Sequence, residues 1–290
     1  MLLDKAIVRL LPAVPRPVVQ LFSARYIAGA TLDDAVASVR ALNAEGKAAT
    51  IDVLGEEITH AAEARAIARQ YLDVFDAIER NGLDANVSVK LTALGLKLSP
   101  ELCKENLLTV LDQGRFVRID MEDSTTTDDT LRLYRELRED GRENVGVVLQ
   151  AYLRRTLADV RALAELTPNV RLCKGIYVEP PSLAYTDAGA IRTSFVQCLD
   201  ALLDCGATVA AATHDEALIR EALARDVPEL QMLLGVREER AGELVAAGRR
   251  VRIYVPFGEH WYAYALRRLQ ENPAMATTIA RSTIGRALRI

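Results

Sequence analysis

The sequence alternates eight times between a short apolar run and a longer segment, usually with the periodicity of a helix. The apolar runs are rich in β-branched residues, and they are Ala49–Val53, Asn86–Lys90, Phe116–Asp120, Val145–Gln150, Val170–Cys173, Thr208–Ala212, Leu230–Leu233 and Val251–Tyr254. Helical segments follow most of them, for example Ala61–Arg80, Asp128–Arg138, Thr193–Leu203, Glu239–Ala246 and Glu259–Glu271. Strands that are buried on both faces belong to parallel sheets, so this repeat predicts a (β/α)8 barrel. A doubly wound open sheet is the alternative, and it is disfavoured because no G-x-G-x-x-G motif follows the first strand.

The segment before this repeat is predicted to be helical, over Leu2–Leu11, Pro17–Tyr26 and Thr31–Leu42. Thr31 is suited to the N-cap of the third helix, with Asp34 in its first turn. Leu2–Leu11 is amphipathic, which favours packing over the main domain, with contact to a membrane surface as the alternative. We therefore expect N-terminal helices over residues 1–46, a barrel over 47–274 and a tail over 275–290.

Composition excludes several classes of protein. The formal net charge of −4 offers no general attraction for nucleic acid. The four cysteines show no C-x-x-C spacing and the chain has three histidines, so neither a disulfide framework nor a metal site is expected. Neither a secretory segment nor an apolar run of the roughly 20 residues that a membrane span needs is recognised. We expect a cytoplasmic protein, at most peripheral to a membrane.

Polar residues stand at the carboxyl end of every predicted strand. They are Asp52 with Glu56, Lys90, Asp120 with Glu122, Gln150, Arg171 with Lys174, Thr213 with His214, Gln231 and Tyr254. These ends meet at one rim of a barrel, where the active sites of such folds lie. Any one residue could simply bond to its neighbours or to solvent, but their joint occurrence favours a site. Lys90 lies in an apolar strand and needs a partner when it is buried, which we expect Asp120 to supply.

The last predicted helix carries two adjacent arginines. Tyr264, Arg267, Arg268 and Glu271 share about one side of it, because residues three and four apart on a helix face the same way. The planar guanidinium group can hold a carboxylate through two parallel hydrogen bonds, so this face could bind a small amino acid. A solvated helix with an ion pair between Arg267 and Glu271 is the alternative.

Seven segments in order along the chain resemble those of proline dehydrogenase, the flavoenzyme family that oxidises L-proline. They are Asp52–Glu56, Val87–Leu94, Ile119–Asp123, Leu149–Tyr152, Val170–Tyr177, Ala212–Asp215 and Tyr254–Pro273. The resemblance is to the bacterial type with one function, because the two large domains of the bifunctional relatives are not found here. It implies a (β/α)8 barrel whose eighth helix, Glu259–Glu271, lies over the barrel mouth.

The resemblance also implies roles for individual residues. Arg267 and Arg268 would grip the proline carboxylate. The rest of the substrate pocket would be formed by Lys90, Tyr254, Tyr264 and Leu172. Asp120 would order the site, Arg171 would lie beside the N5 edge of the flavin, and Glu56 would pair with Arg267 as a gate when the site closes. FAD would be bound by Arg171 and by Met121, Gln150, Lys174, Gly175, Ile176, Thr213 and His214, the last with a structural histidine as the alternative.

The resemblance implies the first step of proline catabolism, in which hydride transfer from L-proline to FAD gives Δ1-pyrroline-5-carboxylate. Electrons would pass to a membrane quinone, which implies peripheral contact at the inner face of the membrane. Two other classes are weighed against this. One is a barrel hydrolase or aldolase with Lys90 as an amine nucleophile beside Asp120, and the other is a barrel that serves as a scaffold.

Overall fold

Eight apolar runs form the parallel strands that the repeat predicts. The computed structural model describes residues 25–55, 58–262 and 264, and in it the strands close into a barrel in sequence order. They are β1 (Ala48–Val53), β2 (Ala85–Val89), β3 (Val117–Ile119), β4 (Val145–Gln150), β5 (Asn169–Cys173), β6 (Thr208–Ala212), β7 (Glu229–Leu233) and β8 (Arg250–Phe257). The barrel closes through parallel pairing of β1 with β8. The (β/α)8 fold class is confirmed.

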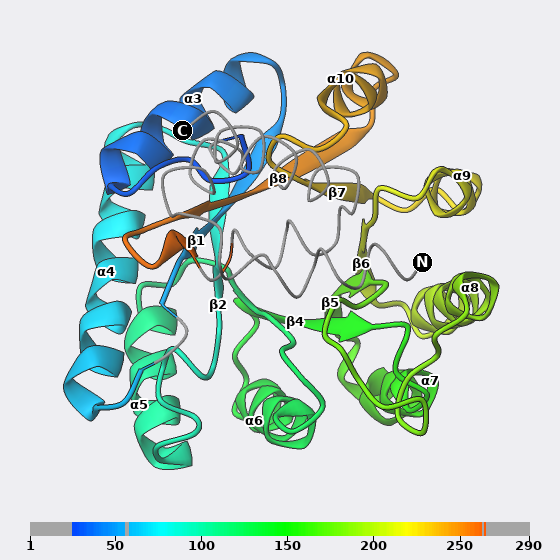
Figure 1. Cartoon of the computed structure of the whole chain (residues 1–290), viewed down its shortest axis with the longest axis horizontal. Helices are drawn as coiled ribbons and strands as arrows, with labels where there is room; N and C mark the ends of the chain where they lie inside the picture. The colour runs from blue at the N-terminus through cyan, green and yellow to red at the C-terminus, as the bar shows by residue number, and fades with distance from the viewer. Residues whose placement is uncertain (1–24, 56–57, 263, 265–290) are drawn as a thin grey trace, which may run out of the picture.

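Helices surround the strands as a ring (Figure 1). They are α3 (Leu32–Ala44), α4 (Ala61–Arg80), α5 (Pro100–Leu111), α6 (Thr127–Glu139), α7 (Thr156–Leu163) with the 3-10 turn η2 (Ala164–Leu166), α8 (Ala188–Asp204), α9 (Glu216–Ala224) and α10 (Glu238–Ala246). In α4 the buried stripe includes Ile67, Tyr71, Val74 and Ile78, at the spacing of one helical face. This apolar stripe packs on the outside of the strands, where the hydrophobic core lies.

Several predicted helix bounds are confirmed or extended. Thr31 caps α3 with a full capping box, in which its hydroxyl accepts from Asp34 N and Asp34 Oδ2 accepts from Thr31 N. Helix α8 begins before the predicted Thr193, because the Asp187 side chain accepts from Ala190 N at 2.8 Å and caps it. The segments Leu2–Leu11 and most of Pro17–Tyr26 and Glu259–Glu271 lie outside the described residues, and the domain bounds at 47 and 274 stay predictions.

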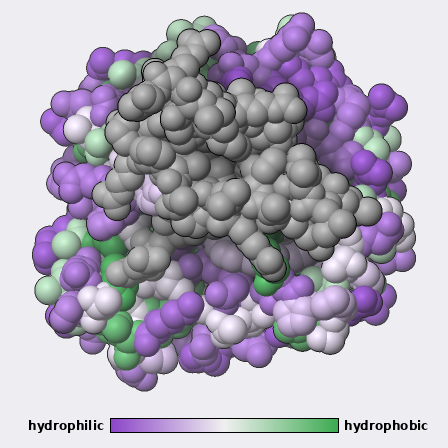
Figure 2. Space-filling view, viewed as in Figure 1, coloured by the Kyte–Doolittle hydropathy of each residue, from purple (hydrophilic) through white to green (hydrophobic). Residues whose placement is uncertain are grey.

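The outer surface around the barrel mouth is largely hydrophilic. Figure 2 shows hydrophilic side chains over most of the visible rim, with hydrophobic ones gathered on the side of α5. Within the part of the chain that the structure describes, no helix combines the length and the apolar character needed to cross a bilayer.

The interior of the barrel is polar, and one glycine makes room for a buried arginine there. Arg118 is 4% exposed, and its guanidinium donates to Asn169 O at 2.8 Å and to Asn169 Oδ1 at 2.6 Å. Burial, followed by the charge of Arg171, lowers the pKa of Arg118 from its ordinary range to about 9. A methyl group at Gly146, on β4, would lie 2.4 Å from Arg118 Nη1. The small residue is therefore required by the neighbouring side chain.

Replacing Gly146 with alanine is expected to lower the free energy of unfolding by about 1–3 kcal/mol, the usual cost of overpacking a core. The added methyl group would displace Arg118 from its bonds to Asn169. Urea unfolding measures the effect. Gly242→Ala is the matched control, since Gly242 lies in α10 with open space around it and should gain about 0.5–1 kcal/mol. Equal stability of the Gly146→Ala protein and the unchanged protein would contradict the packing argument.

Candidate active site

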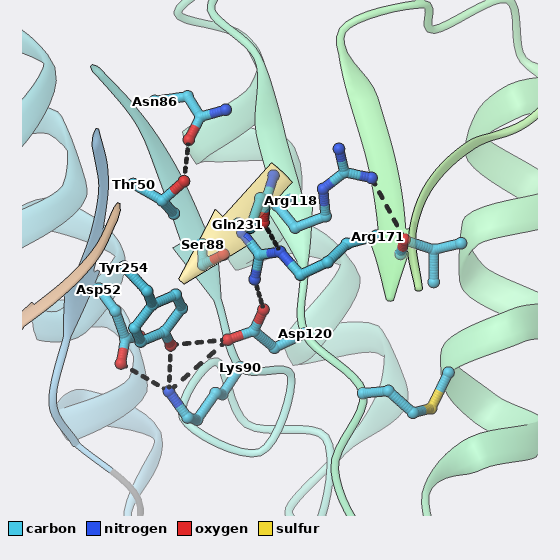
Figure 3. A network of polar contacts seen from close by, with 12 residues as sticks. Thr50, Asp52, Asn86, Ser88, Lys90, Arg118, Asp120, Arg171, Gln231 and Tyr254 are labelled. Atoms are coloured by element: carbon cyan, nitrogen blue, oxygen red, sulfur yellow. Dashed lines mark hydrogen bonds and ion pairs between the residues drawn. The ribbon is translucent and has the colours of Figure 1, made fainter. Parts of the chain in front are cut away.

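Asp120 follows β3 and forms the centre of a polar network at the carboxyl ends of the strands (Figure 3). Its Oδ1 accepts a hydrogen bond from Arg171 Nη1 at 2.8 Å, and its Oδ2 accepts one from the Tyr254 hydroxyl at 2.8 Å. Lys90 Nζ donates to the Tyr254 hydroxyl at 3.2 Å and lies 3.9 Å from Asp120 Oδ2. The structure thus brings together four residues that the sequence analysis placed at the rim from four different strands.

Lys90 has a closer partner than the one predicted. Asp120 pairs with it at 3.9 Å, but Lys90 Nζ donates to Asp52 Oδ2 at 2.7 Å. Strand β2 lies between β1 and β3, so the lysine has an acidic residue on each flank, and the one on β1 is nearer. Asp52 is fully buried and was identified from the sequence only as a polar residue at a strand end. The predicted pairing of Lys90 with Asp120 is therefore present, and the structure adds Asp52 as a closer partner.

The burial of Asp52 changes its acidity. Burial, opposed by the ammonium of Lys90 and supported by the charge of Asp120, raises the pKa of Asp52 from 3.8 to about 6. The Tyr71 hydroxyl donates to Ser88 O at 2.6 Å and lies 3.5 Å from Asp52 Oδ1. Burial raises the pKa of Tyr71 and that of Tyr254 well above their ordinary range. Both phenols therefore keep their protons near neutral pH and act as hydrogen-bond donors to the network.

Because the pKa of Asp52 is higher in the folded chain than in the unfolded chain, the protonated carboxyl group stabilises the fold at low pH. That contribution is fully present below pH 3.8 and is lost as the pH rises through about 6. We expect the difference in unfolding free energy between the natural chain and Asp52→Asn to fall on the order of 3 kcal/mol across this window. Chemical denaturation at a series of pH values measures it.

Glu136→Gln is the control for this pH dependence, because its slope should have the opposite sign. A hydrogen bond from Lys104, at 2.9 Å from Glu136 Oε2, lowers the pKa of Glu136. The stability that Glu136 contributes is therefore present above pH 4.5 and is lost as the pH falls. A flat difference for Asp52→Asn between pH 4 and 6 would show that Asp52 titrates normally in the folded chain.

A cavity of about 870 Å³ lies beside this network and is large enough for a cofactor and a small substrate. Twelve of the predicted site residues line it: Lys90, Asp120, Met121, Gln150, Arg171, Lys174, Gly175, Ile176, Thr213, His214, Tyr254 and Tyr264. They come from the carboxyl ends of β2 to β6, from β8, and from the segments that follow these strands. The spatial convergence that the barrel rule predicts for these residues is what the structure shows.

Leu172 does not line this cavity, and three other predicted site residues lie outside the part of the chain that the structure describes. Leu172 is fully buried in the hydrophobic core, because alternate residues of a strand face opposite sides and Arg171 faces the barrel interior. The predicted role of Leu172 beside the substrate ring stays a prediction. Glu56, Arg267 and Arg268 lie outside the described residues, so the gate and the carboxylate clamp stay predictions.

His214 is oriented by the backbone of the next strand. Its Nε2 accepts from Leu233 N at 3.0 Å, which assigns the ring proton of a neutral imidazole to Nδ1. Its carbonyl accepts from Arg237 Nη1 at 2.7 Å. An acceptor role for Nε2 leaves that nitrogen unsuited to act as a general base. Among the residues that the structure places, no three His, Cys, Asp or Glu side chains gather as ligands for a metal ion.

Sequence reasoning missed the contribution of the segment before α3. Arg25 and Tyr26 line the cavity, and Tyr26 is 7% exposed. Ala28 N donates to Pro256 O at 2.9 Å, which ties this segment to the end of β8. At Gly235, after β7, a methyl group would lie 2.1 Å from Arg25 O, so only glycine permits this approach. Gly235 was the one local feature of the sequence that indicates a close approach to the end of β7, and it does not reveal which segment approaches.

Comparisons with known proteins agree with this geometry. The sequence model of the proline dehydrogenase family matches residues 35–281. Proline dehydrogenase 1 of Bacillus subtilis (strain 168) is 37% identical over 277 residues, which cover 91% of each chain. The proline dehydrogenase of Deinococcus radiodurans is 35% identical over 276 residues, which cover 90% of this chain and 89% of that one.

A solved structure supports the same assignment. The crystal structure of proline utilization A (PutA) from Bdellovibrio bacteriovorus, inactivated by N-propargylglycine, matches with a TM-score of 0.78 at 27% identity. The match covers 87% of this chain and 32% of that one, so the barrel corresponds to a minor part of the PutA chain. The family model, the two similar bacterial chains and the shared barrel lead to the same conclusion. This chain belongs to the proline dehydrogenase family of oxidoreductases, which act on proline.

Proposed function

We propose that the chain oxidises L-proline to Δ1-pyrroline-5-carboxylate with FAD as the hydride acceptor, and that a membrane quinone takes the electrons onward. The observation that carries this proposal is the cluster of Lys90, Asp120, Arg171 and Tyr254 on the wall of the 870 Å³ cavity. Proline has a carboxylate and a secondary amine. Its oxidation removes a hydride from the ring carbon next to nitrogen and a proton from the nitrogen, and no protein side chain can accept the hydride.

The lining of the cavity fits a flavin dinucleotide. Arg25, Arg171, Lys174 and Arg237 supply cationic donors, which suit phosphate groups and an electron-rich ring. Gly175 has a φ of 106° and lies against Tyr152, where a methyl group would come within 2.0 Å of the phenol ring. The backbone can therefore turn sharply along the cavity wall between Lys174 and Ile176. When bound, FAD would supply the two-electron acceptor that the side chains cannot provide.

The side chains of the network would bind and orient the substrate. Asp120 holds Arg171 and Tyr254 through its two carboxylate oxygens, so both groups keep fixed positions on the wall. Arg171 would hold a positive charge where negative charge develops as the hydride leaves proline. Tyr26 and Tyr264 are nearly fully buried and would help to exclude water. Arg267 and Arg268 would bind the carboxylate, and closure of Glu56 onto Arg267 would follow substrate binding.

The experiment is the absorbance spectrum of the purified chain before and after anaerobic addition of L-proline. We expect flavin bands that bleach with the substrate. The pair Arg267→Met and Arg268→Met should each raise the KM for proline about 10- to 100-fold while the flavin bands remain, since each removes a charge-assisted hydrogen bond. A colourless protein, or flavin that proline does not reduce, would overturn the proposal.

The rival function with Lys90 as an amine nucleophile is not favoured by the contacts of that lysine. Its Nζ lies 2.7 Å from Asp52 Oδ2 and 3.9 Å from Asp120 Oδ2, and two acidic neighbours favour a charged ammonium group over the neutral amine that a nucleophile needs. Trapping of Lys90 by borohydride with a carbonyl substrate, in a protein without flavin bands, would support the rival instead.

A further inference from the structure

Arg171 has a second anchor that no substrate or cofactor role explains. Its Nη1 is held by Asp120, while its Nε donates to Gln231 Oε1 on β7 (Figure 3). Arg171 and Gln231 are each 6% exposed. Two bonds from different nitrogens of the guanidinium fix both its position and the rotation of its plane. The bond to Asp120 alone would fix the position of Nη1 but leave the guanidinium plane free to rotate.

The orientation of the Gln231 amide is itself determined by a neighbour. Gln231 Nε2 donates to Glu229 Oε1 at 2.6 Å. An ionised carboxylate can only accept hydrogen bonds, so the amide must present its NH2 group to Glu229 and its carbonyl oxygen to Arg171. With the amide reversed, NH2 would face the N–H donor of Arg171 and neither could bond. Glu229 therefore selects the one orientation in which Gln231 can hold the arginine.

Glu229 is held in turn at the amino-terminal side of the barrel. Its Oε1 and Oε2 each lie 3.0 Å from Arg252 Nε, and Arg250 Nε donates to Oε2 at 3.1 Å. Burial alone would raise the pKa of Glu229, but Arg252, Gln231 and Arg250 together lower it, so the group stays ionised. Residues 229 and 231 face the same side of β7, because side chains alternate along a strand.

We propose that Gln231 and Glu229 are positioning residues for the oxidation, and that Glu229 acts on Arg171 through the amide of Gln231. The inference rests on the proposed function, in which Arg171 stabilises the negative charge that the hydride brings to the flavin. Its consequence is that a carboxylate at the far end of the barrel influences the electron affinity of the cofactor without touching it.

Gln231→Met tests the first step, since methionine has similar length and removes the acceptor. We expect kcat to fall about 10-fold with little change in KM, because one group that acts on developing charge loses its fixed position. The bound flavin should favour its reduced form about 10-fold less, which is a potential about 30 mV more negative. Spectroscopic redox titration with a reference dye measures this, and an unchanged potential together with an unchanged kcat would overturn the proposal.

Glu229→Gln tests the second step, because its amide can donate as well as accept and so no longer selects one orientation of Gln231. We expect a shift in potential in the same direction as that of Gln231→Met. In the double variant with Gln231→Met, Glu229→Gln should add nothing to that shift, since Glu229 is proposed to act only through Gln231. Additive shifts would show that Glu229 acts by another path, such as Arg252, and would overturn its role.

Thr50→Val is the matched control for a general effect on the barrel interior. Thr50 is 1% exposed and donates to Asn86 Oδ1 at 2.6 Å, without contact to Arg171 (Figure 3). It should lower thermal stability and leave the potential unchanged. Measurements on the natural chain distinguish failure of the positioning role from failure of the proposed function. If it binds flavin that proline reduces, but Gln231→Met keeps the same potential and kcat, the positioning role alone fails. If it binds none, the proposed function fails too.

Discussion

Replacing Lys90 with methionine is expected to lower the free energy of unfolding by about 3–5 kcal/mol near neutral pH, the usual cost of removing one partner from a buried ion pair. Methionine fills a similar volume but leaves the fully buried Asp52 without the ammonium that lies 2.7 Å from it. Burial already raises the pKa of Asp52 to about 6, so the carboxyl group should take up a proton when the cation is lost. The loss should therefore be smaller at pH 5 than at pH 8.

The double variant with Asp52→Asn separates this electrostatic cost from a packing defect. If the unpaired carboxylate causes the loss, removing its charge should restore most of the stability of the Lys90→Met protein in urea unfolding. Lys104→Met is the matched control, because Lys104 pairs with Glu136 on the outside of the barrel and an exposed pair contributes at most about 1 kcal/mol. Equal losses for Lys90→Met and Lys104→Met would contradict the importance of burial.

The strands could be predicted because the face of each strand that packs against the helices is rich in β-branched apolar residues, which stand out between the helical segments. The predicted bounds of Val145–Gln150 and Thr208–Ala212 are those of β4 and β6. β8 is longer than the predicted Val251–Tyr254, beginning at Arg250 and ending at Phe257. The prediction was too short because Arg250 at the start and Pro256 near the end are residues typical of loops. In the structure Arg250 is paired with Glu229, and Pro256 lies in the part of β8 that pairs with β1.

The convergence of the polar strand ends could also be predicted, but their partners could not. A barrel brings the carboxyl ends of all strands to one rim, so Lys90, Asp120, Arg171 and Tyr254 had to meet there. Whether Lys90 pairs more closely with an acid on β1 or on β3 depends on register and on side-chain length. Those quantities are set by contacts between strands, which one sequence read along its length does not contain.

The same limit applies to residues that reach the cavity through non-local packing. Arg25 and Tyr26 line it because their segment crosses the end of β7 at Gly235 and is tied to β8 through Ala28. Nothing in the residues around Tyr26 indicates such an approach. In contrast, the alternation of Arg171 and Leu172 on β5 follows a local rule, and applying it would have excluded Leu172 from the cavity wall.

Asp120→Asn is expected to lower kcat/KM for L-proline about 100- to 1000-fold, the effect of losing one strong charge-assisted contact in a buried site. The carboxylate accepts from Arg171 and from Tyr254 through two different oxygens, at 2.8 Å each. Asparagine can offer its carbonyl oxygen to Arg171, but its NH2 group then faces Tyr254, so the hydroxyl can no longer donate to residue 120. It also removes the negative charge between Arg171 and Lys90. Steady-state kinetics with an artificial acceptor measures the loss.

Two further variants distinguish loss of the Asp120 carboxylate from a general defect in the structure of the site. Tyr254→Phe removes one hydrogen-bond donor and leaves the Asp120 carboxylate ionised. It should therefore lower kcat/KM at most about 10-fold, the value of one ordinary hydrogen bond. Asp123→Asn changes an acid a few residues away that faces Lys97 at 3.7 Å on the surface, and it should leave kcat/KM nearly unchanged. If Asp120→Asn resembled Asp123→Asn, Arg171 and Tyr254 would be held well enough by their other contacts. Gln231 would then be the main anchor of the arginine, because its bond to Arg171 Nε does not depend on Asp120.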